Sequence, residues 1–193
     1  MRQNVKHLLK RAFLFLFAIA LLTGSFAVAI EKKTKVLVVY YSLHGTTEKV
    51  AQEIQKETSG TLFEITMVEP FTQSDREISS IAKEQRKTNK LPDIASPLPN
   101  LSQYDVIFIG GPVWSGTLPT PLMTFLQQVD FSGKTVVPFW TDAGSPGNYE
   151  ADFSKSISKC KVLNGLGFSG VNSMSKSNLN KQVKDWILKL NIR

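Results

Sequence analysis

A short loop rich in hydroxyl groups, residues 42–47, is the first part of the sequence whose residue types are suited to binding a ligand. It reads Ser-Leu-His-Gly-Thr-Thr, and its hydroxyls and main-chain amides are hydrogen-bond donors of the kind that hold a phosphate. Where such a loop leads into a helix, the unpaired amides and partial positive charge of the helix N-terminus strengthen the attraction. The sequence therefore predicts a phosphate site here, with an ordinary strand-to-helix turn as the alternative.

The residues on either side of this loop predict the strand and the helix that such a site requires. Residues 36–41 form a continuous apolar run rich in β-branched and aromatic residues, which is typical of a strand buried on both faces of a parallel sheet. After the loop, Val50, Ala51 and Ile54 recur at helical spacing, and Gly60 stands where this helix would end.

Two further loops are suited to enclosing a ligand, and each follows a predicted strand. The apolar residues 106–109 lead into residues 110–117, a loop that contains one tryptophan. Residues 134–140 form another predicted strand, followed by the glycine-containing loop 141–148. Pro138 conflicts with a central strand because proline lacks a donor for the ladder. It lies near the C-terminal end of the predicted strand, and we expect a bulge or a loss of pairing there to accommodate it.

The remaining predicted elements continue the alternation of strands and helices. Residues 61–67 alternate as a half-exposed edge strand does, and residues 161–171 form a glycine-interrupted fifth strand. Further helices are predicted after a capping-box pattern at Ser74, after Pro119 and Pro121, around Phe153, and over residues 177–190. This alternation predicts an α/β fold, a doubly wound sandwich with a five-stranded parallel sheet in the order 2-1-3-4-5.

The three loops are expected to meet at one place in this fold. In doubly wound sheets, ligands bind beyond the carboxyl ends of the strands, where the strand order reverses. The loops 42–47, 110–117 and 141–148 all follow strands close to that point. The sequence thus predicts one ligand site built from a hydroxyl-rich, a tryptophan-containing and a glycine-containing loop.

Residues 1–29 have the order of features of a secretory signal peptide. Four cations precede the apolar run of residues 12–22, and Ala-Val-Ala at residues 27–29 is a small-x-small cleavage pattern. The alternative is an uncleaved membrane anchor, because residues 12–30 are mostly apolar and nearly long enough to span a bilayer. We therefore expect an exported protein, extracellular, periplasmic or in the cell envelope, with residues 30–193 as a single domain.

Charge and composition exclude several classes of function. The chain has 23 Lys and Arg against 16 Asp and Glu; without the four cations of residues 1–29, 19 remain against 16, a net charge of about +3. No basic stripe with interleaved aromatics is present, which argues against a nucleic-acid partner. Cys160 is the only cysteine, so no internal disulfide forms, and we interpret it as a structural thiol. After residue 29 the only histidine is His44, so no metal-ligand cluster is expected.

With its three loops in place, the chain resembles the flavodoxin-like proteins. Residues 42–47 are similar to the flavodoxin phosphate loop, whose usual form is Ser/Thr-x-Thr-Gly-Asn-Thr. Residues 110–119, Gly-Gly-Pro-Val-Trp-Ser-Gly-Thr-Leu-Pro, resemble the second flavin loop of a bacterial subfamily, commonly Gly-x-Pro-Ile-Trp-Trp-Gly-Thr-x-Pro. Asp-Phe-Ser-Gly-Lys-Thr at residues 130–135 fits the same subfamily, and the likeness extends over residues 35–192.

The resemblance implies a non-covalently bound FMN. The residues that it implies for the phosphate are Ser42, His44, Gly45, Thr46 and Thr47, with Leu43 as a further cofactor-binding residue of the same loop. The residues that it implies on either side of the isoalloxazine are Pro112, Val113, Trp114, Gly116 and Thr117 on one, and Thr141, Asp142, Ala143 and Gly144 on the other. No side chain is expected to act as acid, base or nucleophile, because the redox chemistry belongs to the flavin.

Some positions depart from the family pattern. His44 replaces a hydroxyl, and it would attract phosphate when protonated or point to solvent when neutral. Thr46 replaces the usual asparagine, and Ser115 stands where a second tryptophan is common, so stacking on the flavin is expected to be weaker. Trp114 is alternatively a packed loop aromatic. The export signal and mildly basic charge also differ from familiar acidic electron carriers.

Two functions are therefore carried forward. The first is an exported protein that binds FMN and transfers electrons to small-molecule or protein acceptors, either as a carrier or as a quinone or flavin reductase. The second is a non-redox binding module that uses the same fold to hold another phosphate ligand or a protein partner. The convergence of three flavin loops favours the first, while the export signal, His44 and Ser115 favour the second. The sequence identifies neither an electron donor nor an acceptor.

Overall fold

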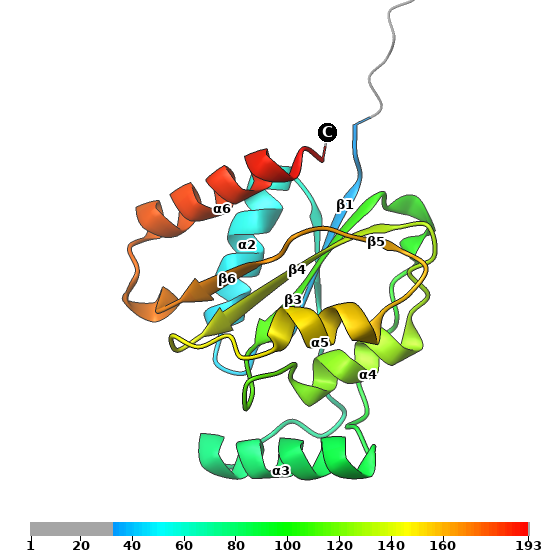
Figure 1. Cartoon of the computed structure of the whole chain (residues 1–193), viewed down its shortest axis with the longest axis vertical. Coiled ribbons are helices and arrows are strands. Elements are labelled where there is room, and N and C mark those ends of the chain that lie inside the picture. The colour runs from blue at the N-terminus through cyan, green and yellow to red at the C-terminus, as the bar shows by residue number, and fades with distance from the viewer. Residues whose placement is uncertain (1–32, 193) are drawn as a thin grey trace, which may run out of the picture. The chain divides into compact units, whose positions relative to one another are not determined.

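A computed structural model of the protein describes residues 33–192, which fold around a parallel β-sheet (Figure 1). The predicted signal peptide or anchor, residues 1–29, lies outside the described residues. Within residues 33–192, none of the helices combines the length and the apolar character needed to cross a membrane.

The strands are arranged in the order β2-β1-β3-β4-β5 and all pair in parallel, so the predicted doubly wound fold is confirmed. Their bounds are β1 Val36–Tyr40, β2 Thr61–Glu64, β3 Val106–Pro112, β4 Thr135–Asp142, β5 Lys161–Val162 and β6 Leu166–Ser169. As their continuous apolar runs predict, β1, β3 and β4 are buried, whereas β2 is exposed at the edge. The edge strand ends at Glu64, earlier than the alternation over residues 61–67 predicts.

The predicted fifth strand is split into β5 and β6, and Pro138 explains the interruption. Both short strands pair with β4, but the register slips by one residue between the pairs Val136↔Val162 and Phe139↔Leu166. This bulge lies on the side of β4 that faces β5 and β6. On that side a residue other than proline at position 138 would donate its main-chain N–H to the ladder. The expected change of pairing is therefore present, but Pro138 lies in the middle of β4 and not near its end, because the strand continues to Asp142.

Helices cover both faces of the sheet, as Figure 1 shows. The helices α2 (Thr46–Thr58) and α6 (Lys176–Leu190) cover one face, and α4 (Thr120–Gln128) and α5 (Tyr149–Ser156) cover the other. Successive residues of β1 alternate between the two cores, with Val38 on the α2 side and Val39 on the α4 side. These two packed layers hold the carboxyl ends of β1, β3 and β4 in fixed positions.

The helix α3 (Asp75–Thr88) follows the capping-box pattern at Ser74 and is largely exposed. Only Ile78 and Ala82 of this helix are buried. It begins with the predicted capping box, in which the amide and the hydroxyl of Ser74 both donate to one carboxylate oxygen of Glu77. Figure 1 shows α3 set apart from the sheet, beyond the layer of α4 and α5. Two short 3₁₀ turns, Leu101–Gln103 and Val171–Ser173, complete the described elements.

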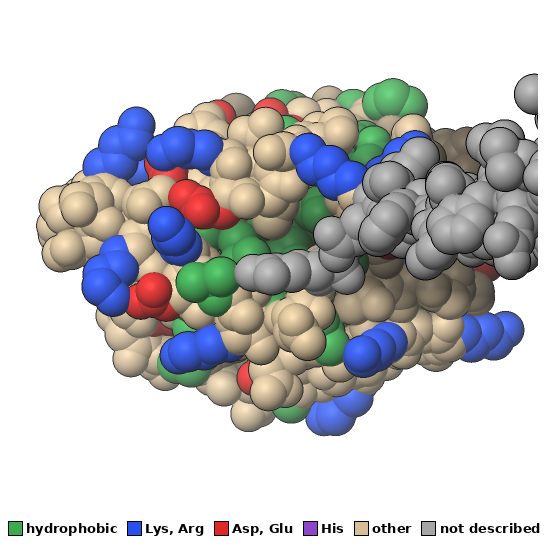
Figure 2. Space-filling view, turned by 90° about the horizontal axis from the view of Figure 1, so that it is seen from above, with side chains coloured by type: hydrophobic (Ala, Val, Ile, Leu, Met, Phe, Trp, Pro, Cys, Tyr) green, Lys and Arg blue, Asp and Glu red, His purple; other side chains and the backbone are tan. Residues whose placement is uncertain are grey.

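Charged side chains are dispersed over the face drawn in Figure 2. Lys and Arg side chains surround this face, and Asp and Glu side chains stand among them. On this face the cations do not gather into a stripe of the kind that would follow a nucleic-acid backbone.

Candidate functional site

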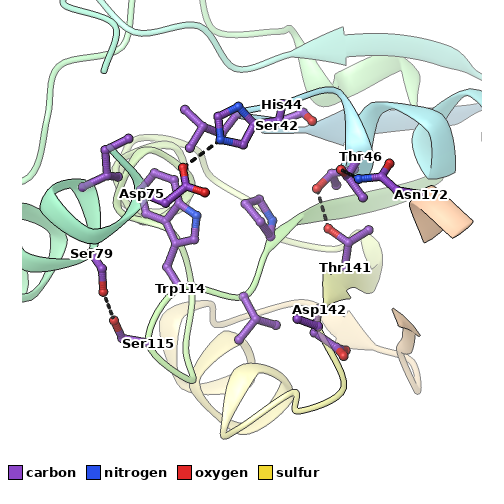
Figure 3. A pocket seen from close by; sticks show the side chains of 16 residues that line it. Ser42, His44, Thr46, Asp75, Ser79, Trp114, Ser115, Thr141, Asp142 and Asn172 are labelled. Carbon is purple, nitrogen blue, oxygen red and sulfur yellow. Dashed lines mark hydrogen bonds and ion pairs between the residues drawn. The ribbon is translucent and has the colours of Figure 1, made fainter. Parts of the chain in front are cut away.

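A pocket of about 420 Å³ lies at the carboxyl ends of β1, β3 and β4, where the three predicted loops converge (Figure 3). Its lining residues come from these loops, from α3 and from the turn after β6: Ser42, Leu43, His44, Thr46, Thr47, Asp75, Ile78, Ser79, Pro112, Val113, Trp114, Ser115, Thr141, Asp142, Ala143 and Asn172. The volume is in the range of pockets that hold a small molecule or cofactor.

The first loop contains donors that the described residues leave without partners. Gly45 is the N-cap of α2, adopts a φ of 76°, and leaves the first turn of the helix without a side-chain cap. The Oγ atom of Ser42 is buried and has no hydrogen-bond partner among the described residues. Buried polar groups are normally paired, so both features indicate a place for a hydrogen-bonding ligand such as an anion.

The two threonines of this loop are held by side chains from distant parts of the chain. The Oγ1 atoms of Thr47 and Thr141 lie 2.8 Å apart, so the start of α2 is joined to the carboxyl end of β4. Thr46 Oγ1 accepts a hydrogen bond of 3.0 Å from the side-chain amide of Asn172, and the amide oxygen of Asn172 accepts one of 2.9 Å from Lys49. Figure 3 shows Asn172 beside Thr46, at the end of the pocket away from Asp75.

The second loop places an aromatic wall on the pocket. The half-buried indole of Trp114 makes edge-to-face contacts with Tyr41 and Phe71, each with ring centroids 5.5 Å apart. Main-chain hydrogen bonds between Trp114 and Thr117 close the loop into a tight turn. Trp114 is thus packed against the loops and also lines the pocket. The alternative of a packed loop aromatic thus describes its contacts, and the flavin role of Trp114 stays a prediction.

The third loop is held by Asp142, whose carboxylate is used within the protein. Its Oδ1 atom accepts hydrogen bonds from the amide of Gly144 and from the hydroxyl of Ser169, at 2.7 and 2.6 Å. The loop also contacts the second loop through the amide of Asn148, which donates to the carbonyl of Gly116. The residues of this loop that line the pocket are therefore fixed by β6 and by the tryptophan loop.

The helix α3 adds a side to the pocket that sequence analysis did not predict. His44 Nε2 and Asp75 Oδ1 lie 2.8 Å apart, and the hydroxyls of Ser79 and Ser115 also lie 2.8 Å apart (Figure 3). These two contacts join the first and second loops to the same helix. His44 is therefore engaged by α3 at its Nε2, a contact that was not expected, while 64% of its side chain stays exposed to solvent.

Most predicted site residues line the pocket, but Gly45, Gly116, Thr117 and Gly144 do not. The Thr117 hydroxyl is used within the protein and donates to Asp152 at 2.7 Å. The lining residues that sequence analysis missed are Asp75, Ile78, Ser79, Ser115 and Asn172. The capping box at Ser74 fixed where α3 begins, but no local pattern indicated that this helix reaches the pocket.

The two tyrosines at the end of β1 are held in their neutral form by their surroundings. Burial, together with the nearby Glu64 and Glu48, raises the pKa of Tyr40 to about 12, and burial raises the pKa of Tyr41 further above its usual value. In residues 33–192, His, Cys, Asp and Glu side chains do not gather in groups of three that could hold a metal. Burial raises the pKa of the Cys160 thiol, which keeps it in the unreactive neutral form.

The chain is similar to a family model, to solved structures and to a curated relative. A family model described as flavodoxin matches residues 35–190. Solved flavoproteins from Bacteroides uniformis and Bacteroides eggerthii are 31% and 30% identical, with TM-scores of 0.70 and 0.71; the matches cover 81% and 83% of this chain and 99% of each of those chains. A flavoprotein from Lactobacillus acidophilus, solved in complex with FMN, is 32% identical over 69% of this chain and 93% of its own, with a TM-score of 0.65.

A curated relative has a named activity. An NAD(P)H dehydrogenase (quinone) from Azorhizobium caulinodans is 27% identical over 158 residues, which cover 75% of this chain and 77% of the relative.

Proposed function

This chain belongs to the flavodoxin family, and we propose on that basis that its pocket binds FMN and that the protein transfers electrons through this cofactor. The observation that carries the proposal is the set of unsatisfied donors in the first loop. The buried Ser42 hydroxyl and the uncapped first turn of α2 are suited to the phosphate of FMN. The family assignment and the local chemistry thus agree.

The other two loops are suited to the flavin ring. Trp114 presents an aromatic surface on one side of the pocket, and Thr141–Ala143 line the other. An aromatic ring contributes large apolar contact and excludes water from a planar ligand. The carboxylate of Asp142 is held by Gly144 and Ser169, so the third loop keeps its shape before the ligand enters.

When bound, FMN supplies the electron-transfer chemistry, and the protein supplies binding, orientation and the electrostatic surroundings. The residues of the first loop hold the phosphate, and Trp114 positions the ring. The high pKa values of Tyr40 and Tyr41 keep these phenols uncharged around neutral pH, so they add no negative charge beneath the site. No described side chain needs to act as a nucleophile in this scheme.

A small electron acceptor, such as a quinone, is the finer part of the proposal. The relative from Azorhizobium caulinodans is named for quinone reduction with NAD(P)H. In this chain, α3 contacts both the phosphate loop and the tryptophan loop and adds residues to the pocket wall. We take the enclosure on this side to favour a small acceptor over a docked protein.

The protein is also proposed to be exported, on the sequence of residues 1–29. Mass spectrometry of the protein isolated from its own cells tests this proposal. A mature N-terminus at Ile30 would support cleavage of a signal peptide, a retained segment in the membrane fraction would support an anchor, and an intact chain in the cytoplasm would contradict export.

Titration of the purified protein with FMN is the experiment that tests the cofactor. The visible spectrum of the bound flavin and quenching of its fluorescence should give a micromolar or tighter dissociation constant. If FMN binds, oxidation of NADPH or NADH with a soluble quinone then tests the reductase activity. A protein that does not bind FMN would contradict the redox function and leave the non-redox binding module, with other phosphate compounds as the ligands to test.

A further inference from the structure

We infer that Lys49 and Asn172 form a hydrogen-bond relay that fixes the direction of the Thr46 hydroxyl and so selects a phosphorylated flavin over riboflavin. The inference rests on the proposed binding of FMN, and it assigns a role to two residues outside the three predicted loops. Neither residue forms part of the motif by which the phosphate loop resembles other flavodoxins.

The chemistry of Lys49 sets the orientation of the relay. Its ammonium group only donates hydrogen bonds, and its Nζ atom lies 2.9 Å from the side-chain oxygen of Asn172. The oxygen of the amide must therefore face Lys49, and the NH₂ group must face the opposite way. On that side it lies 3.0 Å from Thr46 Oγ1 and donates to it.

The relay leaves the hydrogen of the Thr46 hydroxyl free for a ligand. A threonine hydroxyl has one hydrogen to donate, and its oxygen can accept at the same time. Because Thr46 accepts from Asn172, its own hydrogen points elsewhere, and Thr46 lines the pocket beside the uncapped first turn of α2. The positive charge of Lys49 strengthens the chain by polarising each hydrogen bond in turn.

The turn that holds Asn172 is well defined. The 3₁₀ turn Val171–Ser173 starts after Gly170, which adopts a φ of 65°, and Ser173 donates back to the carbonyl of Gly170. Val171 is buried in the core on the α2 and α6 side, so it anchors the turn against the sheet. Asn172 is thereby held next to Thr46 although 126 residues separate them in the sequence.

The relay lies at the phosphate end of the pocket. Thr46 belongs to the first loop, and Figure 3 shows Asn172 beside Thr46 and away from Trp114. Riboflavin has the same ring as FMN but no phosphate. Loss of the relay should therefore weaken FMN binding and leave riboflavin binding unchanged.

Asn172→Asp is the sharpest variant. A carboxylate still accepts from Lys49, but it cannot donate to Thr46, so the Thr46 hydroxyl turns to donate to the carboxylate instead of to the ligand. We expect the dissociation constant for FMN to rise about tenfold or more and that for riboflavin to stay within about twofold. Asn178→Asp is the matched control, since it adds the same charge to an exposed residue of α6 that does not line the pocket.

Lys49→Met tests whether the positive charge of Lys49 strengthens the relay. FMN affinity should fall about threefold in dilute buffer, and the difference should shrink in concentrated salt because the ammonium group is exposed. Lys56→Met removes the same charge from the last turn of the same helix, away from the pocket, and should leave both flavin affinities unchanged.

A double-mutant cycle separates a positioning role for Asn172 from a structural one. If Asn172 acts through Thr46, then Asn172→Ala should weaken FMN binding in the wild-type background and have little further effect in a Thr46→Val background. Circular dichroism and thermal unfolding of each variant establish that it is folded.

The results distinguish this inference from the function on which it rests. Wild-type protein that binds neither flavin would overturn the proposed cofactor and the relay together. Wild-type protein that prefers FMN, combined with an unchanged FMN affinity in Asn172→Asp, would overturn the relay alone. Equal losses of FMN and riboflavin affinity in Asn172→Asp would also overturn it, since they would indicate a general disturbance of the pocket.

Discussion

The hydroxyls of Thr47 and Thr141 form a buried hydrogen bond of 2.8 Å that joins the phosphate loop to the end of β4. Both residues are almost fully buried, with 1% and 4% of their surface exposed. The bond connects the first and third loops of the site directly, across 94 residues of sequence. The geometry of the pocket therefore depends on a contact between two polar groups inside the core.

Replacement of one of these threonines by valine should destabilise the protein by about 1–3 kcal/mol, because the other hydroxyl is left buried without a partner. The double variant Thr47→Val/Thr141→Val should be less destabilised than the sum of the single variants, since neither hydroxyl then remains. Unfolding in urea measures both effects. Thr72→Val, at an exposed position, is the control and should change the free energy of unfolding by less than about 0.5 kcal/mol. Additive losses would contradict the coupling.

Gly147→Ala should separate the second and third loops. A Cβ atom at this position would clash with the carbonyl oxygen of Gly116, and Gly147 also adopts a φ of 56°. We expect a loss of stability together with a loss of FMN affinity. Gly133→Ala is the control for backbone strain alone, because Gly133 has a φ of 72° but open space around its Cα. It should cost about 1 kcal/mol and leave FMN affinity unchanged. Equal behaviour of the two variants would contradict the contact between the loops.

Trp114→Ala should weaken the binding of FMN and of riboflavin to the same extent, because the indole lies against the ring end of the proposed site. A loss of about tenfold is expected from the removal of an aromatic wall. Fluorescence titration with both flavins measures the effect. Trp186→Phe is the control: Trp186 packs against Phe108 and Phe168 in the core, away from the pocket. A loss confined to FMN would show that Trp114 does not contact the ring.

The capping box of α3 should contribute a pH dependence to stability. The hydroxyl of Ser74, and then its amide, donate to the Glu77 carboxylate and hold the pKa of this group below its usual value. Because the folded-state pKa is lowered, the contribution is present above the unfolded pKa of about 4.3 and is lost as the pH falls through the folded-state value. Ser74→Ala should raise the pKa of Glu77 and reduce this acid loss.

NMR titration of the Glu77 carboxyl and unfolding at pH 7 and in acid check this prediction. Ser80→Ala is the matched control on the same helix, since the Ser80 hydroxyl donates to a main-chain carbonyl and not to a carboxylate. A Glu77 pKa that does not respond to Ser74→Ala would contradict the assigned cause.

Patterns local to the sequence were sufficient to predict the sheet and the three loops. The buried run of β1 and the alternation of strands and helices fixed the topology, because a continuous apolar strand has few other places in an α/β protein. Even the conflict at Pro138 was predicted, since a missing N–H must be accommodated by a change in pairing. The exact place of the bulge depends on which residues of β5 and β6 pair with β4. No local sequence pattern contains this pairing register.

The part of the site that was not predicted comes from tertiary contacts. Asn172 follows the last strand, and nothing in its neighbours indicates that the turn carrying it reaches Thr46. Asp75 and Ser79 belong to an exposed helix whose composition is typical of a solvated surface. Their contacts with His44 and Ser115 follow from where α3 lies and not from any motif.

The contact between Thr46 and Asn172 also has a consequence for the order in which the protein becomes competent. No segment that stops before β6 contains both residues, so a growing chain on the ribosome cannot assemble the complete phosphate end of the pocket. Tight binding of the cofactor should therefore begin only after the last strand has docked. A ligand that binds at this late stage stabilises the completely folded domain and does little to stabilise partly folded chains.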